Sequence, residues 1–125
     1  MRLLLVEDDE DDYILTQDLL NRGMETPFVL FWSETYESGL QALSHVRPDL
    51  VIVDYDLAGR NGADFICTAR ERGFDLPYLI FSGRDVNEVE AAAARCRAIA
   101  SLSKNRATPT ILSSAVKNAI KAHGP

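Results

Sequence analysis

The stretch Pro48-Asp49-Leu50-Val51-Ile52-Val53-Asp54 is the clearest indicator of the fold. Four consecutive apolar residues follow a Pro-Asp turn, which is typical of a strand buried on both faces in a parallel sheet covered by helices. Asp54 comes directly after this apolar run, and sites in open α/β sheets lie beyond the carboxyl ends of the strands. Residues 50–53 therefore predict a central strand, with Asp54 at the functional edge of the sheet.

Apolar runs and helical patterns alternate on both sides of this strand. We expect the other strands at residues 3–6, 28–32, 78–81 and 98–102. Helical spacing of apolar residues predicts a helix after each strand, with signals at four helix ends: Gly23, Asn61, the pair Asp85 and Glu88, and Thr108-Pro109. The pattern is a βα unit repeated five times. It predicts an α/β fold with a doubly wound, five-stranded parallel sheet.

Length, composition and charge limit the class of protein. The 125 residues are 46% apolar and 26% charged, which fits one globular domain over residues 1–125. No apolar run approaches the roughly 18 residues of a membrane helix, and residues 3–6 are too short for a signal peptide, so we expect a cytoplasmic protein. The net charge of -6 argues against nucleic-acid binding by this domain alone. Cys67 and Cys96 are expected to be reduced thiols packed on helices.

Side chains that can carry chemistry gather where the predicted strands end. They are Glu7, Asp8 and Asp9 after the first strand, Asp54 and Asp56 after the third, Ser82 after the fourth and Lys104 after the fifth. Crowded carboxylates favour a hard divalent cation, and Mg²⁺ is bound by one or two carboxylates together with waters and phosphate oxygens. A carboxylate can also attack phosphorus and form an aspartyl phosphate. The cluster therefore predicts Mg²⁺-dependent transfer of a phosphoryl group to Asp54.

Other polar residues have simpler interpretations. Glu10, Asp11 and Asp12 fit the first turn of a helix, where the helix dipole favours negative charge, and we assign them no chemical role. His45 and His123 fall in or near predicted surface helices.

The chain resembles the receiver domain of response regulators over essentially its whole length. The resemblance is carried by residues 4–9 (LLVEDD), 48–54 (PDLVIVD), 76–83 (LPYLIFSG) and 102–104 (LSK), and Gly62 also fits the family pattern. It implies a flavodoxin-like sheet of order 2-1-3-4-5. It also implies that Mg²⁺ is held by Glu7, Asp8, Asp54 and the backbone carbonyl of Asp56, with Asp9 as an alternative member of the acidic pair.

The resemblance implies roles for the remaining residues and for partners. Asp54 is the expected phosphoacceptor, Ser82 the switch hydroxyl and Lys104 the lysine that pairs with phosphate. The expected partners are a sensor histidine kinase or phosphotransfer protein, a downstream protein target and a second copy of the chain. We expect no enzymatic activity beyond self-phosphorylation and autodephosphorylation. Asp56 and Arg84 should flank the mouth of the site.

Three residues depart from the family pattern. Ala58 and Asn105 stand where proline is usual, and Ser101 stands where an aromatic switch residue is usual. A cis bond before Asn105 would cost about 2.5–4 kcal/mol, so we expect a trans Lys104–Asn105 bond. Ser101 cannot fill a ring-sized gap, so switching is expected to centre on the loop that begins at Ser82.

Three other functions are compatible with parts of the sequence. Asp54-Tyr55-Asp56-Leu57 fits the paired-aspartate motif of haloacid dehalogenase-type phosphohydrolases, but that motif normally follows the first strand. A flavodoxin-like electron carrier needs a hydroxyl- and glycine-rich phosphate loop where this chain has Glu7-Asp8-Asp9. A pseudo-receiver that only binds partners is the third alternative; Ser101 and Asn105 favour it, and the retained Asp54 and Lys104 argue against it.

Overall fold

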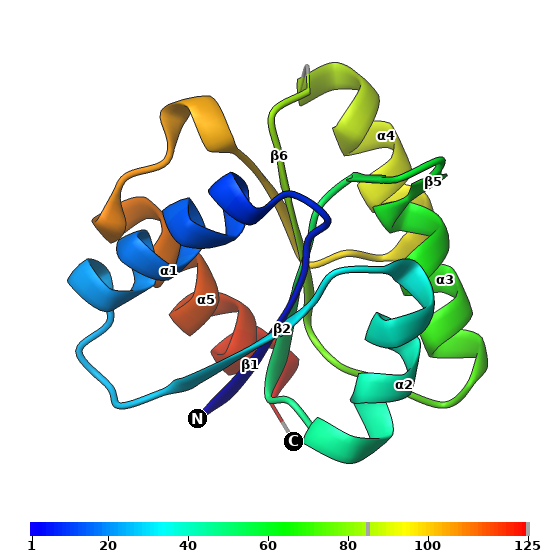
Figure 1. The fold of residues 1–125 in the computed structure, drawn as a ribbon, viewed down its shortest axis with the longest axis horizontal. Coiled ribbons are helices and arrows are strands. Elements are labelled where there is room, and N and C mark those ends of the chain that lie inside the picture. The colour runs from blue at the N-terminus through cyan, green and yellow to red at the C-terminus, as the bar shows by residue number, and fades with distance from the viewer. Residues whose placement is uncertain (85, 125) are drawn as a thin grey trace.

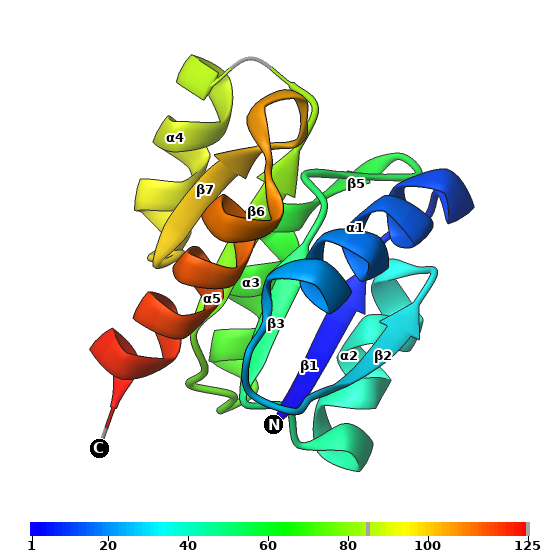
Figure 2. The same cartoon turned by 90° about the vertical axis from the view of Figure 1, so that its left-hand side faces the viewer.

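Five apolar runs lie side by side as parallel strands in the computed structural model, which describes residues 1–84 and 86–124. The strands are β1 (Arg2–Val6), β2 (Val29–Ser33), β3 (Leu50–Val53), β6 (Tyr78–Ser82) and β7 (Ala100–Ser103). Their order is β2-β1-β3-β6-β7, which is 2-1-3-4-5 when these strands alone are counted (Figure 2). The predicted fold class and sheet order are confirmed.

Helices cover both faces of the sheet. On one side lie α1 (Glu10–Gly23) and α5 (Pro109–His123), and on the other lie α2 (Tyr36–Val46), α3 (Gly62–Glu71) and α4 (Val86–Cys96), as Figures 1 and 2 show. The sheet has one hydrophobic core on each face, and alternate residues of β3 pack into one core or the other. Leu50 and Ile52 belong to the cluster with α1 and α5, whereas Val51 and Val53 belong to the cluster with α2, α3 and α4. This two-sided burial explains the unbroken apolar run of residues 50–53.

The element boundaries follow the predictions closely. β2 begins one residue later than expected, and β7 covers residues 100–103 instead of 98–102. The side chain of Asn61 caps α3 by accepting from the Asp64 N–H, and Thr108 caps α5, whose first residue is Pro109. The expected capping box at the fourth helix includes Asp85, which lies outside the described residues. No helix in the described part of the chain is both long and apolar enough to cross a membrane.

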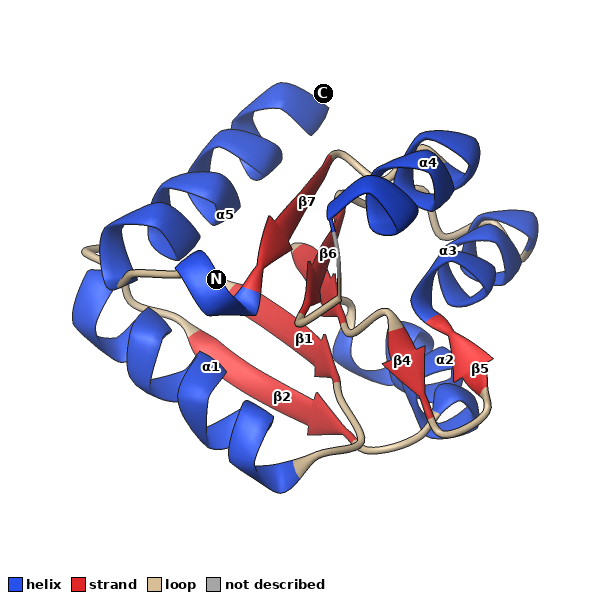
Figure 3. Cartoon of the chain, turned by 90° about the horizontal axis from the view of Figure 1, so that it is seen from above, coloured by secondary structure: helices blue, strands red, loops and turns tan. Residues whose placement is uncertain are grey.

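A two-stranded hairpin after Asp54 was not anticipated. β4 (Asp56–Leu57) pairs with β5 (Arg60–Asn61) through a two-residue turn, next to the start of α3 (Figure 3). Both turn residues have positive φ, 43° at Ala58 and 89° at Gly59. Arg60 fixes the hairpin to α2 by an ion pair of 3.0 Å with Glu37 and by stacking on the Tyr36 ring. The hairpin holds Asp56 at the rim of the sheet edge.

Replacing alanine by glycine should have opposite effects on the free energy of unfolding in this turn and in α4. Ala58→Gly should raise the free energy of unfolding by about 0.5–1 kcal/mol, because glycine adopts positive φ without the steric cost that alanine incurs. Ala58→Pro, which introduces the residue usual in the family, should destabilise the protein because proline cannot adopt this φ. Ala94→Gly on the exposed face of α4 is the control, and should cost about 1 kcal/mol. Urea unfolding measures all three; a loss of stability in Ala58→Gly would contradict the prediction.

Candidate functional site

The carboxyl ends of β1, β3 and β7 open onto one cleft of about 610 Å³. Its lining brings together residues from four segments of the chain, namely Asp8, Asp9, Asp12, Leu15, Asp54, Asp56, Gly83, Arg84, Lys104 and Asn105. Glu7 and Ser82 are almost fully buried beside it. The residues singled out in the sequence therefore converge in the structure.

Asp54 lies at the centre of this arrangement because β3 is the central strand. Its backbone N–H donates to the Val6 carbonyl at 2.9 Å, and only 6% of the residue is exposed. Burial raises the pKa of the Asp54 carboxyl, and the Lys104 ammonium opposes that shift. A Cβ at Gly62 would lie 2.4 Å from the Asp54 carbonyl oxygen, so only glycine allows α3 to start against this residue.

Three carboxylates form a group that could hold a cation. Glu7, Asp8 and Asp54 offer oxygen atoms that all lie within 4.8 Å of one another. Asp9 is used differently, because its side chain caps α1 by accepting from the Asp11 N–H at 3.0 Å. Burial raises the pKa of Glu7 to about 8, and the nearby Asp54 adds to the rise while Lys104 opposes it. A set of hard carboxylate oxygens, two of them buried, fits Mg²⁺.

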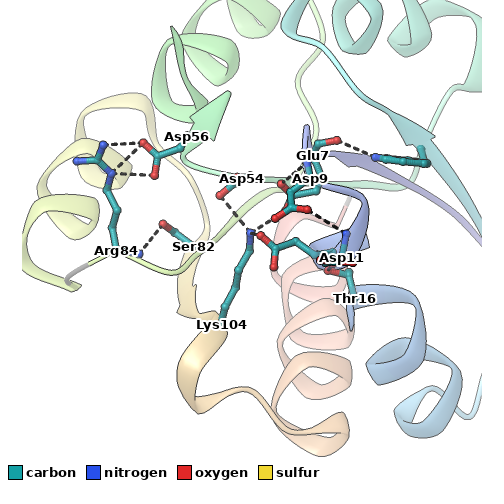
Figure 4. Close-up of polar contacts among 11 residues, drawn as sticks. Glu7, Asp9, Asp11, Thr16, Asp54, Asp56, Ser82, Arg84 and Lys104 are labelled. Atoms are coloured by element: carbon teal, nitrogen blue, oxygen red, sulfur yellow. Dashed lines mark hydrogen bonds and ion pairs between the residues drawn. The ribbon is translucent and has the colours of Figure 1, made fainter. Parts of the chain in front are cut away.

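Lys104 is the cation that this acidic group already contains. Its Nζ lies 2.7 Å from Glu7 Oε1, 2.9 Å from Asp12 Oδ2 and 3.4 Å from Asp54 Oδ1. The side chain is 8% exposed, and Figure 4 shows its amino group directed toward Glu7 and Asp54. Burial acts to lower the pKa of Lys104, but the hydrogen bonds to Glu7 and Asp12 outweigh it and raise the pKa. The lysine is therefore charged, and it sets the electrostatics of the site.

The contact of Asp12 with Lys104 corrects the interpretation of Asp12 as only a first-turn helix residue. Asp12 does lie in the first turn of α1, but its carboxylate also reaches a lysine 92 positions away. The neighbouring acids Glu10 and Asp11 are exposed. The helix starts at the same edge as the site, so one side of its first turn must face the cleft. The rotation of α1 about its own axis places Asp12 on the side that faces the cleft. The spacing of residues in the sequence does not predict this rotation.

The other wall of the cleft is formed around Ser82 and Arg84. Ser82 is 1% exposed, and its Oγ accepts from the Arg84 N–H at 3.1 Å. The Arg84 guanidinium pairs with Asp56 at 2.7 Å, as Figure 4 shows. It also pairs with Glu88 at 3.3 Å. The expected position of Asp56 and Arg84 at the mouth of the site is confirmed, and the two form an ion pair there.

Two of the residues that depart from the family pattern, Ser101 and Asn105, lie on β7 and in the loop after it. Ser101, on β7, lines a cavity of about 20 Å³ together with Ser82 and Val89. No cis peptide bond occurs in the described chain, so the Lys104–Asn105 bond is trans, as expected. The loop after β7 is held instead by a short 3₁₀ turn, η1 (Lys104–Arg106), whose cap is the Ser103 side chain accepting from the Asn105 N–H.

Trp32 is a further residue that the sequence did not connect with the site. Its indole N–H donates to the Glu7 backbone carbonyl at 2.7 Å, and its ring stacks on Tyr13 with centroids 4.1 Å apart. It is the only tryptophan of the chain. Its fluorescence can therefore report changes at Glu7.

Comparisons with known proteins agree with this geometry. The family model described as response regulator receiver domain matches residues 3–116. The chain is 34% identical over 96 residues to the transcriptional regulatory protein QseB of Escherichia coli O157:H7, an alignment that covers 76% of this chain and 42% of that protein. The chain thus spans less than half of this relative.

Solved structures show the same fold at low sequence identity. One is a putative response regulator from Chloroflexus aurantiacus J-10-fl, with a TM-score of 0.86, 24% identity and coverage of 96% of this chain and 97% of that chain. Another is the signal receiver domain of an HD domain-containing protein from Pseudomonas fluorescens Pf-5, with a TM-score of 0.85, 22% identity and coverage of 98% and 88%.

Proposed function

Because the chain belongs to the response regulator receiver domain family of two-component systems, we propose that it accepts a phosphoryl group on Asp54 from a phosphohistidine donor and then changes its binding to a partner. The observation that carries the proposal is the position of Asp54: a buried carboxylate with Lys104, Glu7 and Asp8 around it and an open cleft in front of it. Each of these groups has a role in phosphoryl transfer.

Each of these residues has a separate role in the proposed reaction. Glu7, Asp8, Asp54 and the Asp56 backbone carbonyl would hold Mg²⁺, which neutralises charge on the phosphoryl oxygens when it is bound. An Asp54 carboxylate oxygen attacks phosphorus, the phosphorus–nitrogen bond of the donor breaks, and the donor imidazole leaves with the electron pair and takes up a proton. Lys104 then pairs with one phosphoryl oxygen, and the Ser82 hydroxyl donates a hydrogen bond to another.

The geometry also weighs against the phosphohydrolase alternative. That chemistry requires the second aspartate, Asp56, to act as a general acid. Here the Asp56 carboxylate accepts from the Arg84 Nε at 2.8 Å and pairs with the same guanidinium at 2.7 Å. The Asp56 side chain is therefore occupied by Arg84, and the structure does not present it to a leaving group.

The test that separates the alternatives is incubation with Mg²⁺ and acetyl phosphate. The expected result is one added phosphate per chain by intact-mass measurement, stable in acid and labile in base. Continuous release of phosphate with fast turnover would instead indicate a phosphohydrolase. Absence of any added phosphate at saturating Mg²⁺ would leave the pseudo-receiver as the function, with binding of partners as its only activity.

The proposed setting follows from the family. The donor is a sensor histidine kinase or phosphotransfer protein in the cytoplasm, and the output is a downstream protein target or a second copy of this chain. Nucleic-acid binding is not proposed for this domain, because its net charge is -6.

Loss of the rim ion pair should shorten the lifetime of the phosphorylated form. Arg84 and Asp56 are each about half exposed, so water screens their ion pair and the pair adds little to stability. The pair nevertheless lines the cleft, on the approach of a water that would attack the phosphoryl group in line. Arg84→Ala should therefore lose phosphate faster, by about twofold to fivefold, a small effect as expected for one exposed ion pair. Arg106→Ala, an exposed arginine on η1, is the control. The decay of purified phosphoprotein measures the rate. An unchanged or longer half-life in Arg84→Ala would contradict the proposal that the ion pair shields the phosphoryl group from water.

A further inference from the structure

Lys104, the lysine proposed to pair with the phosphoryl group, is held by a carboxylate outside the predicted site. We propose that Asp12 is a positioning residue that competes with the phosphoryl group of Asp54 for Lys104. Asp12 would hold the ammonium group of Lys104 closer to itself than to Asp54 in the resting protein, and would release it on phosphorylation. The inference rests on the proposed function of Asp54 and adds a restraint to it.

The contact distances define the competition. The Lys104 ammonium has three protons, and its two shortest contacts, 2.7 and 2.9 Å, are to Glu7 and Asp12. Asp54 is third at 3.4 Å, beyond the usual length of a charged hydrogen bond. The resting lysine is thus closer to Glu7 and Asp12 than to the phosphoacceptor. The third proton can reach a phosphoryl oxygen on Asp54, but a movement of the ammonium toward that oxygen would lengthen one of the two shorter contacts.

Glu7 and Asp12 would not compete equally once the site is loaded. Glu7 is a proposed metal ligand, so its carboxylate would be shared with the cation. Asp12 is separate from the group of Glu7, Asp8 and Asp54 whose oxygens lie close enough for one ion. When Glu7, Asp8 and Asp54 bind the cation, Asp12 is therefore the carboxylate that still competes with the phosphoryl group for Lys104.

The position of Asp12 explains how it could exchange partners. Its side chain is 33% exposed, so water can replace the ammonium at modest cost when the lysine leaves. Lys104 is 8% exposed and has little access to solvent. It therefore needs acidic partners in both states. The exchange moves the buried cation from one anion to another without leaving it unpaired.

The adjacent residue supplies a matched control. Asp11 has the same charge in the same turn of α1, but it is exposed and does not contact Lys104 in the ion pairs described. Asp11→Asn reproduces the change in net charge and in helix dipole interaction. Asp12→Glu keeps the charge and can still reach the lysine. Asp12→Ser is a second variant that lacks the carboxylate.

The experiment measures the affinity of each variant for beryllofluoride at saturating Mg²⁺, with Trp32 fluorescence as the readout. Beryllofluoride stands in for the phosphoryl group, so the measurement does not depend on turnover. Asp12→Asn and Asp12→Ser should bind it about fivefold more tightly than the wild type, the equivalent of about 1 kcal/mol for one ion pair. Asp11→Asn and Asp12→Glu should stay within about twofold of the wild type on the same scale.

The outcomes separate the inference from the function on which it rests. If the wild type binds beryllofluoride but Asp12→Asn binds it with the same or lower affinity, Asp12 does not compete with the phosphoryl group for Lys104. The proposed function would still stand. An equal gain in Asp11→Asn would assign the effect to general charge and would also overturn it. If the wild type does not respond to beryllofluoride and takes no phosphate from acetyl phosphate, the proposed function fails, and the inference fails with it.

Discussion

Asp54→Asn is expected to abolish incorporation of phosphate from acetyl phosphate at any concentration of Mg²⁺ or donor. The substitution keeps the shape of the side chain and removes the nucleophilic oxygen, because an amide oxygen does not form a stable bond to phosphorus under these conditions. The variant should fold at least as stably as the wild type in the absence of Mg²⁺. Burial raises the pKa of Asp54, which shows that the charge is costly in the folded state.

Asp9→Asn provides the control for this experiment. Asp9 lies at the same edge and undergoes the same chemical change, but its side chain caps α1, a role that asparagine fills equally well. It should retain phosphorylation at close to the wild-type rate. Intact-mass measurement over time compares both variants. Phosphate uptake by Asp54→Asn at the wild-type rate would place the acceptor elsewhere, and loss of uptake in Asp9→Asn would bring Asp9 into the metal pair.

Lys104→Met is expected to lower the free energy of unfolding by about 3 kcal/mol at pH 8 without Mg²⁺. The ammonium is the positive charge between Glu7, Asp12 and Asp54, and its removal leaves two nearly buried carboxylates without compensation. Mg²⁺ should restore much of the loss, because it returns positive charge to the site and binds only the folded state. Lys117→Met, at an exposed position on α5, should change the stability little.

The loss should shrink as the pH falls to 5. Burial raises the pKa of Glu7 from 4.5 to about 8 in the folded protein, so the folded state keeps a proton that the unfolded chain has released. Stability from this group therefore decreases as the pH rises between those two values. Removing Lys104 raises the pKa of both Glu7 and Asp54 further, so the decrease extends to higher pH and the variant loses more stability than the wild type between pH 5 and 8. The pKa of Lys104 is itself raised, so its charge is constant across this range. Urea unfolding at pH 5 and 8 measures the difference; an equal loss at both values would contradict the role of the carboxylates.

The sequence alone was sufficient to predict the fold and to predict which candidate residues lie together at one edge of the sheet. Leu50-Val51-Ile52-Val53 has no polar face, so it had to lie in a sheet covered on both sides. Parallel strands connected by helices bring all their carboxyl ends to one edge. Asp54, Ser82 and Lys104 therefore had to converge once the strands were recognised. The trans bond before Asn105 followed from the cost of a cis bond without proline.

Only the tertiary structure showed the features that depend on local turn geometry and on the rotation of helices against the sheet. The hairpin of residues 56–61 came from a turn in which Ala58 adopts positive φ, a conformation that no propensity predicts for alanine. The use of the Asp9 side chain as a helix cap, instead of as a member of the carboxylate group of Glu7, Asp8 and Asp54, depends on where α1 begins. The contact of Asp12 with Lys104 joins residues 92 positions apart and depends on the angle at which α1 faces the site. Periodicity identifies which residues share a helix face, but only packing against the sheet fixes the direction of that face.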